Sequence, residues 1–224
     1  MVTHMALISS TNPAVTVLAG ARDTSVADAG AFYVGVTPTP GTGIISSGSV
    51  QAFTETTPYL VLFNSGLLTI YPAHLRLHTT VVGATNSVAQ NWTNTIDVGN
   101  RWSSGGTALT ISNTNMNSAN KSGAVINVGA VTASAASGVR RVIGHQAVKF
   151  VNIETVHDCI QFNWGGSQQV DPASLINNTT TISHTTVNFA PLAIGPNQSM
   201  VLVRWGASYT TGVTYEVEFG FIEK

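Results

Sequence analysis

The chain has 224 residues, of which 43% are hydrophobic and only 8% are charged, and its formal net charge is −1. Its hydrophobic content and alternating apolar positions exclude a disordered chain. The near-zero charge and the scattered Lys and Arg residues argue against nucleic acid as the main partner. No apolar run reaches the ~20 residues of a membrane helix. Few charges and many Ser, Thr, Asn and Gly residues suit a protein packed in an assembly, or equally a sandwich that is soluble through hydroxyls and amides.

The first 50 residues have a looser pattern than the rest of the chain. Short apolar pieces are separated by polar turns, and residues 37–43 form a Pro- and Gly-rich segment. We therefore expect residues 1–43 to form an arm or a pair of edge strands. Residues 44–224 are expected to form a single domain.

From residue 48 onward, strand patterns follow one another closely, with turn signals between them, and no amphipathic helix longer than about two turns appears. This spacing predicts an all-β, antiparallel jelly-roll-type β-sandwich with an extended N-terminal arm. Residues 199–205 are mostly apolar on both faces, which predicts a strand that is covered on both sides or that lies at a subunit contact. In the final strand, apolar and polar or small residues alternate strictly. One face carries Tyr215, Val217, Phe219 and Phe221, and the other carries Thr214, Glu216, Glu218 and Gly220.

Residues 91–106 are polar and Gly-rich and carry two tryptophans, which predicts a long surface loop or a splayed hairpin. Exposed tryptophans in polar loops can stack on sugars or anchor a partner protein. Trp92 and Trp102 are therefore the residues that a ligand-binding role would use. Trp205 is expected in the core.

Two groups of histidines are candidate sites of chemistry. His74, Arg76 and His78 share one strand face, but the two histidines are ~13 Å apart along a strand, too far for one metal ion. His157 and Cys159 also alternate onto one face. Their ~6.5 Å separation and the lack of an oxyanion site favour an inert, buried cysteine over a nucleophile.

The acidic and amide-rich stretches give equally weak signals. Glu216 and Glu218 are ~6.5 Å apart on one face, near the spacing of glycoside-cleaving carboxylates, but a solvated strand face has the same pattern. Residues 113–117 imitate the ligand rhythm of a calcium loop and lack every carboxylate. We therefore expect a protein that is not an enzyme, with no catalytic residue, no metal and no cofactor.

Two stretches resemble a known family: DVGNRWSSGGTALTISNTNMNSAN at residues 97–120 and IGPNQSMVLVRWGASYTTGVTYEVEFGFIEK at residues 194–224. They are similar to head decoration, or cement, proteins of tailed bacteriophages, which have a jelly-roll β-sandwich. The resemblance extends over the chain from about residue 50. It implies a homotrimer that binds the major capsid protein of the same virus. The expected location is the outer capsid surface of the virion, after synthesis in the host cytoplasm, without a nucleic-acid or membrane partner.

On this hypothesis, the arm supplies the contact with the capsid. The residues expected to make this contact are Val15, Val17, Leu18, Phe32, Tyr33 and Val34. The alternative is a receptor- or glycan-binding module of a tail fibre or spike, which would use Trp92 and Trp102.

Overall fold

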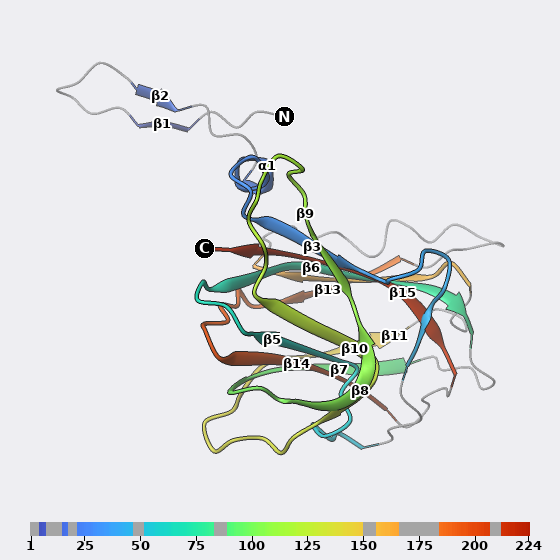
Figure 1. Cartoon of the computed structure of the whole chain (residues 1–224). Helices are drawn as coiled ribbons and strands as arrows, with labels where there is room; N and C mark the ends of the chain where they lie inside the picture. The colour runs from blue at the N-terminus through green and yellow to red at the C-terminus, as the bar shows by residue number, and fades with distance from the viewer. Residues whose placement is uncertain are drawn as a thin grey trace.

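A computed structural model describes residues 5–7, 15–17, 22–46, 52–82, 89–149, 156–165, 184–206 and 212–224. This part of the chain is almost entirely β-structure, with one short helix, α1 (Arg22–Asp28) (Figure 1). The strands are β1 (Met5–Leu7), β2 (Val15–Val17), β3 (Phe32–Val36), β4 (Ile44–Ile45), β5 (Leu60–Asn64), β6 (Ile70–Val81), β7 (Ala89–Val98), β8 (Trp102–Ala108), β9 (Thr110–Asn113), β10 (Ala124–Ala133), β11 (Arg141–Lys149), β12 (Cys159–Trp164), β13 (His184–Phe189), β14 (Gln198–Trp205) and β15 (Thr214–Glu223).

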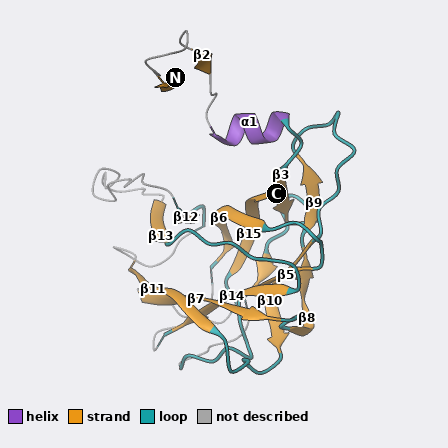
Figure 2. Ribbon diagram, turned by 90° about the vertical axis from the view of Figure 1, so that its left-hand side faces the viewer, coloured by secondary structure: helices purple, strands orange, loops and turns teal. Residues whose placement is uncertain are grey.

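Two sheets pack face to face and form a sandwich, as the spacing of the strand patterns predicts (Figures 1 and 2). One sheet has six strands in the order β11-β7-β14-β5-β10-β8. The other has seven, in the order β13-β12-β6-β15-β3-β9, with β4 paired to β15. Among the described strands, only β12 and β13 pair in parallel, and all other pairs are antiparallel. The predicted all-β sandwich is confirmed.

The strand pairing identifies the sandwich as a jelly roll. Its eight main strands are, in chain order, β3, β5, β6, β7, β11, β12, β14 and β15. The first pairs with the last, the second with the seventh, the third with the sixth and the fourth with the fifth. These pairs alternate between the two sheets, as in a long hairpin rolled around a core.

The strands β8, β9 and β10 are inserted between β7 and β11 and widen both sheets at one side. β10 pairs with β5 and β8 in the six-stranded sheet, whereas β9 pairs with β3 in the seven-stranded sheet. Between β8 and β9, the buried Leu109 donates its N–H to the Ile126 carbonyl at 2.9 Å. The insertion therefore links the two sheets along this edge.

The core between the sheets follows the predicted alternation of β15, because Tyr215, Val217 and Phe219 are all buried in it. The prediction that β14 is covered on both faces is also confirmed. Met200 and Leu202 lie in the main core, and the opposite face forms a second cluster of Val61, Val131, Ala133, Val201 and Val203. The segment before β5 reaches this second cluster: Thr56 accepts a backbone hydrogen bond from Ala133.

Of the two alternatives predicted for residues 91–106, the long surface loop is wrong, since the stretch forms two strands that are joined by a short turn and do not pair with each other. Most of it forms β7, which lies between β11 and β14, and the first part of β8. Trp92 is fully buried, with its ring 4.9 Å from that of Phe162 and 5.5 Å from that of Tyr59. Asn94 and Thr95 are buried too, although both are polar. Central placement in the sheet, which satisfies backbone groups on both sides, overrides the polar sequence here.

The sandwich begins at β3 rather than at residue 44. β3 falls inside the predicted arm, yet it pairs with β15 on one side and with β9 on the other. Tyr33 is only 3% exposed, and its ring stacks on Phe221 at 5.7 Å. Of the described strands in the predicted arm, β1 and β2 pair outside the two sheets.

Candidate functional site

A small hairpin at the N-terminus is the part of the described chain that stands apart from the sandwich. β1 and β2 pair with each other in the antiparallel register Met5↔Val17 and form a sheet of their own. Figures 1 and 2 show this hairpin beyond α1, away from both sandwich sheets. Five of its six strand residues are apolar by sequence: Met5, Ala6, Leu7, Val15 and Val17.

The helix between the hairpin and the sandwich is held by amide side chains from the loop after β9. Asn113 and Asn120 both donate to the Gly30 carbonyl, at 2.9 and 3.1 Å. Asn115 donates to the Asp28 carbonyl at 3.0 Å. The last carbonyls of a helix have no partner within it, and Asn115 supplies one to Asp28. The hairpin is therefore connected to a point that the sandwich fixes.

The same loop explains the calcium-like rhythm of residues 113–117. The side-chain oxygen of Asn113 accepts the N–H of Asn115, and that of Asn115 accepts the N–H of Asn117, both at 2.9 Å. These oxygens are used in turns of the loop itself. Gly30 fits against the loop because a Cβ at this position would lie 2.3 Å from the Ser118 hydroxyl, and its φ of +66° also favours glycine.

The structure separates the six residues predicted to contact a capsid. Val15 and Val17 belong to β2, and Leu18 lies outside the described residues. Phe32 and Val34 are half-buried on β3. Tyr33 lies in the core, so its predicted role as a contact residue is wrong.

The two tryptophans predicted to bind a ligand have opposite surroundings. Trp92 is buried and cannot contact a ligand, so that prediction is wrong. Trp102 is 38% exposed, and its indole N–H donates to the Gly105 carbonyl at 2.9 Å. It opens β8, an edge strand in which all seven residues are exposed. Trp102 therefore remains accessible to a partner.

The outer face of the seven-stranded sheet carries a cluster of charged residues. His74, Arg76 and His78 share this face, as predicted, and Glu218 contacts His74 at 3.0 Å and Arg76 at 3.1 Å. Glu216 lies 3.5 Å from His78. Both carboxylates thus face neighbouring basic groups, the arrangement of a solvated strand face rather than of an acid–base pair.

A shallow hollow of about 340 Å³ lies beside this cluster. Its wall includes the Pro- and Gly-rich segment after β3, where the Gly41 N–H donates to the Glu216 carboxylate. The lining residues are Val36, Thr37, Pro40, Arg76, His78, Glu216, Val217 and Glu218. The charged residues that line the hollow are therefore members of the cluster described above, already paired with one another.

Cys159 has the environment of an unreactive thiol. Burial raises its pKa, and Glu218 and Asp158 raise it further, whereas only Arg76 lowers it. A raised pKa leaves little thiolate, which is the nucleophilic form. His157 lies in the turn before β12 rather than on a strand with Cys159, so the predicted sharing of one strand face is wrong.

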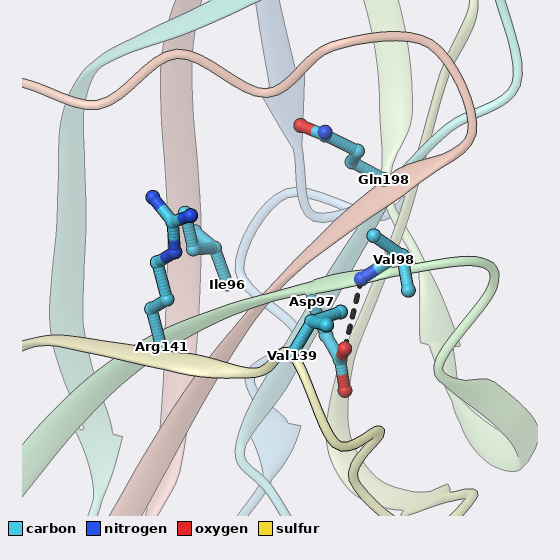
Figure 3. Close-up of a pocket in the computed structure, with 6 residues that line it drawn as sticks. All are labelled: Ile96, Asp97, Val98, Val139, Arg141 and Gln198. Carbon is cyan, nitrogen blue, oxygen red and sulfur yellow. Dashed lines mark hydrogen bonds between the residues drawn. The ribbon is translucent and has the colours of Figure 1, made fainter.

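A second hollow, of about 200 Å³, lies where β7, β11 and β14 meet (Figure 3). Its lining residues are Ile96, Asp97, Val98, Val139, Arg141 and Gln198. Asp97 is engaged in a buried ion pair with Arg101, at 2.7 Å, in which the two side chains are 0% and 3% exposed. Its carboxylate also accepts the N–H groups of Val98 and Ser137 and the Ser137 hydroxyl.

These contacts decide the charge of Asp97. Burial raises its pKa, but the hydrogen bonds from Ser137, Val98 and Arg101 outweigh burial and bring the pKa below its ordinary value. Asp97 therefore acts as a charged clamp between β7 and the segment after β10. Its lone pairs are directed to these partners rather than to a ligand in the hollow.

Comparisons of the chain with protein-family models, with curated proteins and with solved structures found no match. In the part of the chain that the structure describes, no helix has the length and apolar character needed to cross a membrane. The fold therefore defines the class of the protein, an all-β jelly-roll sandwich with an N-terminal hairpin.

Proposed function

We propose that the protein is a decoration protein that binds the outer surface of a bacteriophage head, with the β1–β2 hairpin as its contact with the shell. The observation that carries the proposal is the separation of this mostly apolar hairpin from the sandwich. An isolated two-stranded hairpin is marginally stable in water. A partner that extends its sheet or covers one face stabilises it, which is a common mode of peptide recognition.

The rest of the molecule suits this role. Jelly-roll sandwiches are frequent in viral capsid proteins, and the two stretches that resemble cement proteins include β8, β9, β14 and β15. A protein that binds only the assembled shell stabilises it by mass action. Many copies on a lattice, or several hairpins in one homotrimer, also bind more tightly than one hairpin does. The partner is the major capsid protein of the same virus.

The alternative, a receptor- or glycan-binding module, rests on one observation, the exposure of Trp102 on the edge strand β8. The buried Trp92 no longer supports it. A single aromatic side chain gives less binding surface than the hairpin, so we favour the shell-binding role.

The test uses heads that lack the protein, made from the phage that encodes it. We expect the purified full chain to raise the temperature at which these heads lose their DNA, and the Trp102→Ala variant to do the same. A full chain that leaves this temperature unchanged, but binds host cells or glycans through Trp102, would overturn the shell-binding proposal in favour of the alternative.

A further inference from the structure

Two histidine rings meet at one end of the charged outer face. His78 lies on β6, and His157 lies in the turn that precedes β12. The Nε2 atom of His78 is 3.3 Å from the Nδ1 atom of His157, and the ring centroids are 5.4 Å apart. Both rings are at the surface, since the His78 side chain is 37% exposed and His157 is also exposed. The pair is therefore accessible to an ion from solution.

The backbone fixes the position of both rings. Cys159 is in register with His78, which brings the turn before β12 against this part of β6. Thr79 bonds the turn twice, because its carbonyl accepts the His157 N–H and its N–H donates to the Asp158 carbonyl, both at 2.8 Å. His157 itself has a φ of +76°, a left-handed conformation that turns its side chain out of the strand pattern. Backbone hydrogen bonds to β6 therefore hold the turn that carries His157.

Glu216 lies behind the His78 ring. Its Oε2 atom faces the His78 Nδ1 atom at 3.5 Å. Metal-binding histidines are usually held in this arrangement, with a carboxylate behind the ring. The Glu216 carboxylate is next to Nδ1, so Nε2 of His78 is the ring nitrogen that faces His157.

We propose that His78 and His157 bind a zinc-type divalent metal ion through Nε2 and Nδ1. Two nitrogens at ~2.0–2.1 Å from a tetrahedral zinc ion are separated by about 3.3–3.4 Å. The observed 3.3 Å matches this separation. In the absence of a metal, the two nitrogens are within hydrogen-bond distance of each other, and a bound ion would replace that hydrogen bond. Sequence reasoning rejected the pair His74 and His78, and the structure provides a different partner for His78.

The surrounding groups favour this class of metal. Imidazole nitrogens prefer zinc, copper and nickel, whereas calcium and magnesium prefer oxygen. Besides Glu216, the nearby titratable groups are Cys159, in register with His78 on β12, and Arg76, which Glu218 holds at 3.1 Å. Asp158 is buried beside the turn. Within the described residues, no group of three or more His, Cys, Asp or Glu side chains is placed to hold a metal, so water completes the coordination.

The experiment titrates zinc chloride into the metal-free full chain at neutral pH, followed by calorimetry. We expect one saturable site per chain in the parent. The His78→Ala and His157→Asn variants should bind at least ten-fold more weakly; asparagine tolerates the left-handed backbone of residue 157. The matched control is His74→Ala, because His74 lies on the same strand and face as His78 and also contacts a carboxylate, that of Glu218. This variant should bind zinc as the parent does.

A second readout separates binding from misfolding. Zinc should raise the melting temperature of the parent and of His74→Ala, but not that of His78→Ala or His157→Asn. The melting curves of these two variants without zinc show whether they are folded. Absence of saturable binding in the parent would overturn the proposal. Equal zinc affinity in the parent, His78→Ala and His157→Asn would also overturn it, since the ion would then bind elsewhere.

Discussion

Trp92 and Trp102 lie ten positions apart in a polar stretch, and the fold gives them opposite roles. Trp92 packs against Tyr59 and Phe162 in the core, whereas Trp102 is 38% exposed on an edge strand. We expect Trp92→Ala to lower the free energy of unfolding by about 3–5 kcal/mol through loss of core contacts. Trp102→Ala should change it by less than about 1 kcal/mol. Urea unfolding followed by circular dichroism measures both, and equal losses would show that Trp92 is not in the core.

Asp97 gives the clearest pH dependence at the scale of a residue. Replacing it with asparagine leaves the buried Arg101 without its charged partner, which should cost about 3–5 kcal/mol of unfolding free energy at neutral pH. Since the pKa of Asp97 is lowered in the folded state, its stabilising effect is present above its ordinary pKa of 3.8. The effect is lost as the pH falls through the lower, folded-state pKa.

The measurement compares urea unfolding of the parent and of Asp97→Asn from neutral to acidic pH. The difference in unfolding free energy should stay constant down to the ordinary pKa and shrink below it. A difference that does not change with pH would mean that the charge of Asp97 does not support the fold.

At the scale of an element, β15 and β7 show what the sequence can predict. In β15, large apolar residues alternate with Glu216 and Glu218, so the pattern alone identifies the core face, and the structure confirms it. β7 carries Gln90, Thr93 and Asn94, all of them buried. β7 lies between β11 and β14, which are distant in sequence, and Trp205 of β14 also donates to the Thr93 hydroxyl. The polar sequence of β7 therefore does not predict the buried strand that the structure has.

The proposed zinc-type site leaves no signal in the sequence for a similar reason. His78 and His157 are far apart in the chain, and only the pairing of β6 with β12 brings them together. The sequence around His157 has the pattern of a strand, so its turn geometry and positive φ leave no signal there. The charged face itself was predictable, because His74, Arg76 and His78 alternate on one strand.

The boundary between hairpin and sandwich can be tested by two deletions. Removing residues 1–21 takes away the hairpin and keeps α1 and β3. We expect this variant to melt within a few degrees of the parent. Removing residues 1–43 also deletes β3 from between β15 and β9, together with the Tyr33 ring that stacks on Phe221. This second variant should lose cooperative thermal unfolding by circular dichroism, and a normal melt would contradict the assignment of β3 to the sandwich.

The whole molecule is expected to assemble as a homotrimer. The resemblance to cement proteins implies this state, and β8 leaves an exposed edge strand that a neighbouring copy can cover. Light scattering should give a mass of three chains of 23.4 kDa each. The mass should remain that of a trimer after deletion of residues 1–21, because we place the trimer contact in the sandwich. A monomeric parent would contradict the trimer and leave lattice avidity as the source of tight binding.

The proposal that the hairpin attaches a jelly-roll body to a viral shell is tested most directly by co-sedimentation. Heads assembled from the major capsid protein of the same phage are mixed with the full chain or with the chain that lacks residues 1–21. The account predicts saturable binding of the full chain at a fixed ratio to the capsid protein, and loss of binding by the deletion variant while its sandwich stays folded. Equal binding of both chains would contradict it and place the shell contact on the sandwich.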